Sequence, residues 1–209
     1  RPSETTPGSA NLRVVVDLDP AVLEAQLDNR IRDNLGERRY RAGATANSVL
    51  VPGDQLVLDA RATLPTDGFI SGFAQYSAPI TDDGLTGTIS YSRARSRAVR
   101  GFLSILQFRG EEEVVRAGLS YPLRRTRNSS FIVGLEGTAI NSDSGIFGVT
   151  LIDDRSRFYE LYGRYDWASA DGSTGRFRLG VSQGLNGLGA TGRFNPLRSR
   201  TQGDPEFTA

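Results

Sequence analysis

Segment 68–96, GFISGFAQYSAPITDDGLTGTISYSRARS, alternates between apolar and polar side chains on both sides of a turn. One face of it holds Ile70, Tyr76 and Ile89, whereas the other holds mainly serine, threonine and glutamine. A period of two is that of a β-strand, in which successive side chains point to opposite faces. The apolar face must therefore be covered, either by a protein core or by lipid.

The same two-faced pattern returns along the whole chain of 209 residues. We count nine such segments of about 9 to 14 residues, with almost nothing of helical period between them. Charges of both signs occupy many positions of the polar face. They are Glu24, Asp28, Arg39, Arg41, Asp59, Arg61, Arg116, Glu136, Glu160, Arg164, Asp166, Arg176 and Arg178. The pattern predicts an all-β chain of consecutive antiparallel strands.

The connectors between these segments alternate in length. Those after even-numbered segments are short: VPGD, TDDG, RRTRNSS and SADGSTG. Those after odd-numbered segments begin with RDNLGE and PTDG, and then lengthen to 96–113, 141–156 and the tail from Gly184. Short turns at one rim and long loops at the other, on strands of about ten residues, are typical of an outer-membrane β-barrel.

In such a barrel the apolar face contacts lipid and the polar face lines a wet interior. The aromatic residues Tyr76, Tyr91, Tyr121, Tyr159 and Trp167 lie on the apolar face, as residues of a membrane-interface girdle do. A soluble β-sandwich or other β-rich binding module is the alternative, because its strands would pack their apolar faces against each other.

Composition excludes several classes of function. Histidine and cysteine are absent, which removes the commonest general base, the thiol nucleophile and the commonest metal ligands. A net charge of +1 gives no indication of nucleic-acid binding. The sequence contains no run of about 18 apolar residues, which a transmembrane helix would require. We therefore expect no enzyme, no cofactor and no metal site.

Four stretches resemble, in their order and spacing, the barrel of the two-partner secretion transporters. This family comprises the haemolysin activators and the filamentous haemagglutinin exporters. The stretches are LDN-x(6)-G at Leu27 to Gly36, PGD at Pro52 to Asp54, YPLRR at Tyr121 to Arg125 and SQGL at Ser182 to Leu185. The resemblance runs over nearly the whole chain.

The resemblance implies a fragment of a sixteen-stranded transmembrane barrel in the bacterial outer membrane. Residues 1–18 would end the second polypeptide-transport-associated (POTRA) domain, and residues 19–209 would form the N-terminal part of the barrel. The implied function is export of an unfolded partner protein from the periplasm to the cell surface. The implied partners are that secreted protein and outer-membrane lipid. A passive porin is the alternative of a different class.

The inward charges fit this implied function. Mixed charges suit a hydrated channel that passes an unfolded polypeptide without holding it, because sustained binding needs a single-sign surface or an apolar groove. We therefore predict that the thirteen charged residues above line the channel.

Three further motifs carry less weight. VRGF, from Val99 to Phe102, resembles a loop motif of this superfamily but falls several strands too early in the chain. GLGATG, from Gly187 to Gly192, fits a dinucleotide-binding glycine pattern, yet no helix is predicted after it. The acidic groups Glu111–Glu113 and Asp153–Asp154 are expected at solvated loop ends.

Overall fold

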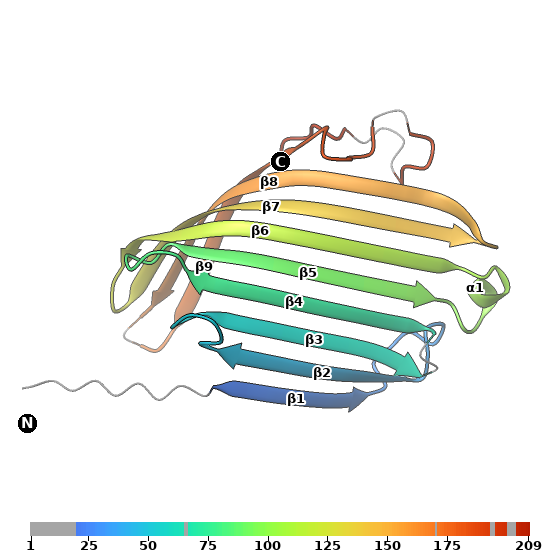
Figure 1. The fold of residues 1–209 in the computed structure, drawn as a ribbon, viewed down its shortest axis with the longest axis horizontal. Helices are drawn as coiled ribbons and strands as arrows, with labels where there is room; N and C mark the ends of the chain where they lie inside the picture. The colour runs from blue at the N-terminus through green and yellow to red at the C-terminus, as the bar shows by residue number, and fades with distance from the viewer. Residues whose placement is uncertain (1–19, 65–66, 170, 193–194, 200–203) are drawn as a thin grey trace, which may run out of the picture.

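The computed structural model describes residues 20–64, 67–169, 171–192, 195–199 and 204–209. Residues 1–18, which by the family resemblance would end the second POTRA domain, lie outside the described residues. The described chain folds into one sheet of nine antiparallel strands in sequence order, from β1 to β9 (Figure 1). The strands are β1 (Ala21–Asp28), β2 (Arg38–Asn47), β3 (Gln55–Leu64), β4 (Phe69–Pro79), β5 (Thr86–Arg97), β6 (Arg109–Arg125), β7 (Ser129–Ile146), β8 (Val149–Ala168) and β9 (Thr174–Gly184).

The sheet is strongly curved and open, with β1 and β9 at its two edges (Figure 1). Residues near the end of the chain extend it beyond β9: Ser182 and Ala209 exchange both backbone hydrogen bonds, and Thr208 lies opposite Gln183. The prediction of an all-β meander of nine strands is confirmed. One helix is described, α1 (Phe102–Ile105), and no helix within the described residues is long and apolar enough to cross a membrane.

The sequence analysis was wrong about the connector at 141–156. Strand β7 continues to Ile146 and β8 begins at Val149, so Phe147 and Gly148 alone form the turn. These strands have 18 and 20 residues, more than a bilayer requires. Beyond the membrane both faces of a hairpin meet water, so the alternation that identifies strands in the sequence is lost there.

Likewise, Glu111–Glu113 and Asp153–Asp154 do not lie in loops. Glu111 to Glu113 belong to β6, which begins at Arg109, and Asp153 and Asp154 belong to β8. The connector between β5 and β6 is correspondingly shorter than predicted, because it covers 98–108.

The PGD turn between β2 and β3 is organised by Asp54, whose side chain is buried. Its carboxylate accepts hydrogen bonds from the backbone N–H groups of Val49, Leu50 and Val51 and from the Tyr76 hydroxyl, at 2.6 to 2.9 Å. Burial alone would raise the pKa of Asp54, but these four donors outweigh it and lower the pKa to about 2. The turn thus holds an ionised carboxylate that fixes its backbone.

The loops at the opposite rim are tied together. The buried Thr63 hydroxyl donates to the carbonyl of Leu35, in the connector between β1 and β2, at 2.9 Å. The N–H of Val99 donates to the carbonyl of Asn34 at 2.8 Å, and Arg100 forms an ion pair with Glu37. The VRGF arginine therefore pairs with a neighbouring loop rather than with the sheet wall.

Candidate channel wall and lipid-facing surface

The register of the strands gives the sheet two chemically distinct faces. Residues opposite each other in adjacent strands share a face. Following this pairing, the apolar positions of the nine segments all fall on one face, which we call the outer face. They include Leu58 and Ala74, Tyr91 and Val115, and Leu135 and Leu161.

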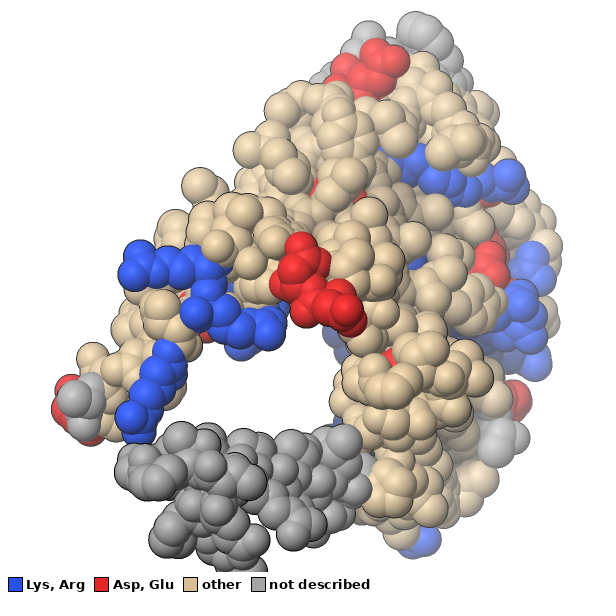
Figure 2. Space-filling model, turned by 60° about the vertical axis from the view of Figure 1, so that its left-hand side comes forward, with Lys and Arg blue, Asp and Glu red and all other residues tan. Residues whose placement is uncertain are grey.

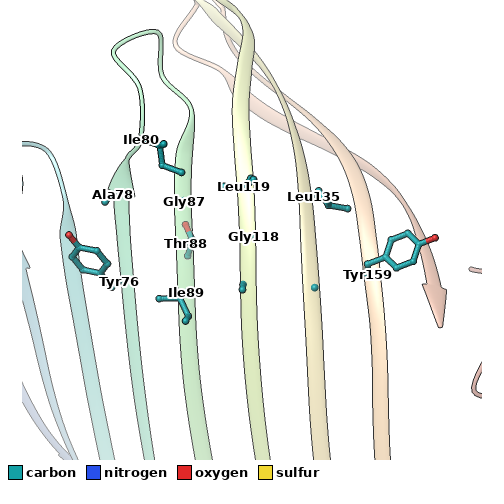
Figure 3. Close-up of a pocket in the computed structure, with 12 residues that line it drawn as sticks. Tyr76, Ala78, Ile80, Gly87, Thr88, Ile89, Gly118, Leu119, Leu135 and Tyr159 are labelled. Atoms are coloured by element: carbon teal, nitrogen blue, oxygen red, sulfur yellow. The ribbon is translucent and has the colours of Figure 1, made fainter. Parts of the chain in front are cut away.

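The outer face exposes large apolar side chains without any covering layer. Leu23 is 81% exposed, Leu179 67% and Leu161 61%. A shallow groove of about 670 Å³ over β4–β8 is lined by residues such as Tyr76, Ile80 and Leu119 (Figure 3). A contiguous exposed apolar face of this kind marks a surface that is covered by lipid or by another apolar partner.

The apolar band runs obliquely across the strands, as it does when strands are tilted in a membrane. One row of register partners joins Tyr159 of β8 to Ile89 of β5 and Tyr76 of β4. Tyr159 lies at the upper edge of the apolar band on β8, whereas Tyr76 lies at its lower edge on β4. A single row of register partners therefore crosses the band from one edge to the other. On β2 the upper limit of the apolar band is Tyr40. The row of register partners through Tyr40 reaches Asp153 on β8, which lies six residues before Tyr159, the upper limit of the band on that strand. A shift of about 20 Å along the strand over six strand spacings of about 4.8 Å corresponds to a tilt of about 35°.

All thirteen charged residues predicted to line the channel lie on the opposite, inner face, and each takes part in an ion pair. They form a cluster on β1–β3, a cluster on β8–β9, and the pair Arg116–Glu136 at 3.8 Å on β6–β7. Basic and acidic side chains border the hollow of the curved molecule (Figure 2). The sequence had placed these residues on one face but could not assign their partners.

The β1–β3 cluster is centred on Asp59. Arg41 and Arg61 lie directly opposite each other, and Asp59 forms ion pairs with both, with Arg61 Nε at 2.7 Å. Asp28 pairs with Arg39 at 2.8 Å, and Glu24 lies 3.6 Å from Arg41. Three carboxylates thus balance three arginines.

The β8–β9 cluster also contains a carboxylate that pairs with two arginines, but these two are not opposite each other. Arg164 and Arg178 are opposite each other in the register. Asp166 accepts from Arg164 at 3.0 Å and also pairs with Arg176, while Glu160 pairs with Arg178 at 3.0 Å. The Arg178 guanidinium also stacks 3.8 Å from the centre of the Tyr162 ring. The cluster holds three arginines and two carboxylates.

The inner faces of β4 and β5, between these clusters, are free of charge. Register places mainly small hydroxyl and amide side chains there, together with the aromatic residues Phe69 and Phe73. The hydroxyl and amide residues are Ser71, Gln75, Ser77, Thr86, Thr88, Ser90 and Ser92. The inner face thus combines clusters of ion-paired charges with uncharged hydroxyl and amide groups.

Sequence reasoning missed a second charged region, on the outer face above the apolar band. Arg93 and Arg95 on β5 pair with Glu111 on β6, and the Tyr91 hydroxyl donates to Glu113 at 2.6 Å. The apolar–polar alternation stops at Tyr91, although the strand continues to Arg97. The signal in the sequence was the run of alternating arginines after Tyr91.

No group of three or more metal-ligating side chains was found among the described residues. The described part of GLGATG, Gly187 to Gly192, belongs to the connector after β9, and residues 195–199 that follow contain turns but no helix. The glycine pattern thus lacks the helix N-terminus that a dinucleotide pyrophosphate needs.

A sheet with one bare apolar face, aromatic girdles, oblique strands and a hydrophilic inner face is the wall of a transmembrane β-barrel. Residues 10–207 match the family described as haemolysin secretion/activation protein ShlB/FhaC/HecB, and the chain belongs to this family. Its location is therefore the bacterial outer membrane.

Among solved structures the chain is similar to CdiB from Escherichia coli, with a TM-score of 0.69 and 17% sequence identity. The similarity covers 85% of this chain and 34% of CdiB, so the chain spans about a third of that structure. At this identity the likeness concerns the fold. The comparison with curated proteins gave no match.

Proposed function

We propose that this chain forms part of the wall of a translocator that exports an unfolded partner protein from the periplasm to the cell surface, in two-partner secretion. Membership of the haemolysin secretion/activation family supports this function. In the same proposal, residues 1–18 end a POTRA domain and residues 19–209 begin the barrel.

The observation that carries the proposal is the paired inner face. A passing polypeptide presents both charge signs and apolar side chains in an unpredictable order. An inner surface whose thirteen charges already have partners offers few unpaired sites at which such a chain could stall. The hydroxyl-rich faces of β4 and β5 add hydrogen-bonding groups without net charge.

The thirteen residues are accordingly proposed to line the conduit. Transport of a polypeptide through a wet interior requires no bound cofactor and no nucleic acid. Outer-membrane lipid covers the opposite face.

The experiment is a comparison of extracellular proteins from the source bacterium with and without the gene for the full-length protein. We expect at least one large protein to disappear from the surface and the medium, and to return when the gene is restored. An inactive full-length protein still inserted in the membrane would serve as the matched control. Unchanged protein export together with reduced uptake of small solutes would contradict the proposal and indicate a porin.

A further inference from the structure

The outer face carries a concentration of arginines directly above the apolar band. Arg93, Arg95 and Arg97 occupy alternate positions of β5 after the girdle residue Tyr91, and Arg109 of β6 lies opposite Arg97. We call these four residues the arginine belt. All basic residues of the chain are arginines, whose planar guanidinium groups can bind phosphate oxygens through two parallel hydrogen bonds.

Carboxylates on the same two strands do not neutralise the belt. Glu111 pairs with both Arg93 and Arg95, the latter at 3.2 Å. Glu113 accepts instead from the Tyr91 hydroxyl and from Asn141 Nδ2, at 2.6 and 3.2 Å. The four arginines therefore have only Glu111 as an ion-pair partner on these two strands, because Glu113 is hydrogen-bonded to Tyr91 and Asn141.

The pair Arg97 and Arg109 is the most informative part of the belt. Like charges directly opposite in a sheet destabilise it, because their Cβ atoms lie about 5 Å apart. Arg109 donates to the carbonyl of Gly148 at 3.3 Å, and within the described residues neither arginine forms an ion pair. Asp143, the nearest acid on β7, stands opposite Glu111. On the inner face, in contrast, the opposed pair Arg41 and Arg61 has Asp59 between them.

The belt begins at the height of the lipid headgroups and rises above them, into the layer where a glycolipid carries its sugars. A strand tilted by about 40° rises about 2.5 Å per residue along the membrane normal. Arg93 and Arg95 then lie about 5 and 10 Å above Tyr91, and Arg97 about 15 Å above it. The polar region of a bilayer begins at the girdle and is about 5 to 8 Å thick on each side, before any sugar is added.

We propose that the arginine belt binds the phosphorylated headgroup of an outer-leaflet glycolipid. The side chains point away from the channel, so the transported polypeptide does not reach them. A headgroup phosphate between Arg97 and Arg109 supplies the negative charge that the protein does not. The inference rests on the membrane orientation, with this rim outside the cell, and not on the nature of the exported partner.

The test uses the full-length transporter purified in a non-ionic detergent, with native mass spectrometry to count bound molecules. The probes are bisphosphorylated lipid A, the same lipid after enzymatic removal of its phosphates, and inorganic phosphate. The test variant is Arg95→Gln with Arg97→Gln and Arg109→Gln. The matched control, Arg124→Gln with Arg125→Gln and Arg127→Gln, removes the same charge at the opposite rim.

We expect the wild type and the control to bind bisphosphorylated lipid A, and the dephosphorylated lipid to bind far more weakly. The belt variant should lose about a hundredfold in affinity, since each basic residue contributes a factor of about five at an anionic surface. Heat-dependent migration on gels verifies that each variant is folded, and the wild-type comparison of the two lipids needs no variant.

Equal affinity of the wild type for both lipids, or equal losses in the two triple variants, would overturn the proposal. Inorganic phosphate that binds as tightly as the lipid would also overturn it, in favour of a free anion. Unchanged lipid binding by the belt variant, together with reduced surface exposure of an exported protein, would assign the belt to a protein partner instead.

Discussion

Replacing Asp59 by asparagine should destabilise the barrel measurably, although the residue faces a wet interior. The side chain of Asp59 is 11% exposed, whereas those of Arg41 and Arg61 are 36% and 44% exposed. A charge-assisted hydrogen bond contributes about 1.5 to 3 kcal/mol when buried, and an exposed ion pair contributes less than about 1 kcal/mol. Loss of two such contacts, each between a largely buried carboxylate and a partly exposed arginine, therefore costs about 2 kcal/mol.

The assay is urea unfolding of the full-length protein in lipid vesicles, followed by tryptophan fluorescence. Asp59→Glu serves as the control, because it keeps the charge. Adding Arg61→Gln to Asp59→Asn should recover part of the loss, since the opposed Arg41 then no longer faces a second cation. A stability within about 0.5 kcal/mol of the wild type for Asp59→Asn would refute the reasoning that the inner charges stabilise one another.

Three further predictions concern the outer face, the turn at Asp54 and the two rims. Leu58→Arg should destabilise the assembled barrel by about 2 to 4 kcal/mol, because it places a charge in lipid. Arg61→Leu should leave assembly intact, and equal tolerance at the two positions would exclude lipid contact at Leu58. Because the folded pKa of Asp54 is about 2 and its ordinary value is 3.8, its stabilising contribution is complete above pH 3.8 and is lost as the pH falls towards 2. The stability difference between wild type and Asp54→Asn in urea unfolding should therefore shrink over that interval, and a constant difference would contradict the assigned role. In whole cells, Val149→Cys should react with an impermeant maleimide and Asp82→Cys only after the outer membrane is opened; the reverse would invert the topology.

The sheet was predictable from the sequence wherever the membrane imposes alternation. In β3 and β4, Leu58 and Ala74 lie on the apolar face and their sequence neighbours lie on the polar face, so the period of two is clear. The hairpin at 141–156 lies beyond the membrane, where both faces are wet. Its polar residues were consequently interpreted as a loop, although the structure places them in β7 and β8.

The channel-facing charges were predictable as a set but not as pairs. Alternation alone assigned Arg41, Asp59 and Arg61 to the polar face. That Asp59 lies between two directly opposed arginines depends on the register of β2 and β3, which the turn at Asp54 sets. The arginine belt was not predicted because its residues occupy the same alternate positions as the outer-face residues. Their place above the apolar band depends on the tilt of the strands, which the sequence does not show.

The most direct measurement of the two-faced wall uses cysteines at small residues of neighbouring strands in the full-length protein. Ser71→Cys and Ser92→Cys point to the inner face, whereas Ala60→Cys and Ala74→Cys point to the outer face. The native residues are small, so each substitution changes little volume. In reconstituted vesicles, a charged water-soluble thiosulfonate should modify the two serine replacements and leave the two alanine replacements unmodified. Equal modification of all four, or modification of Ala60→Cys and Ala74→Cys alone, would contradict a wet inner face and a lipid-covered outer face.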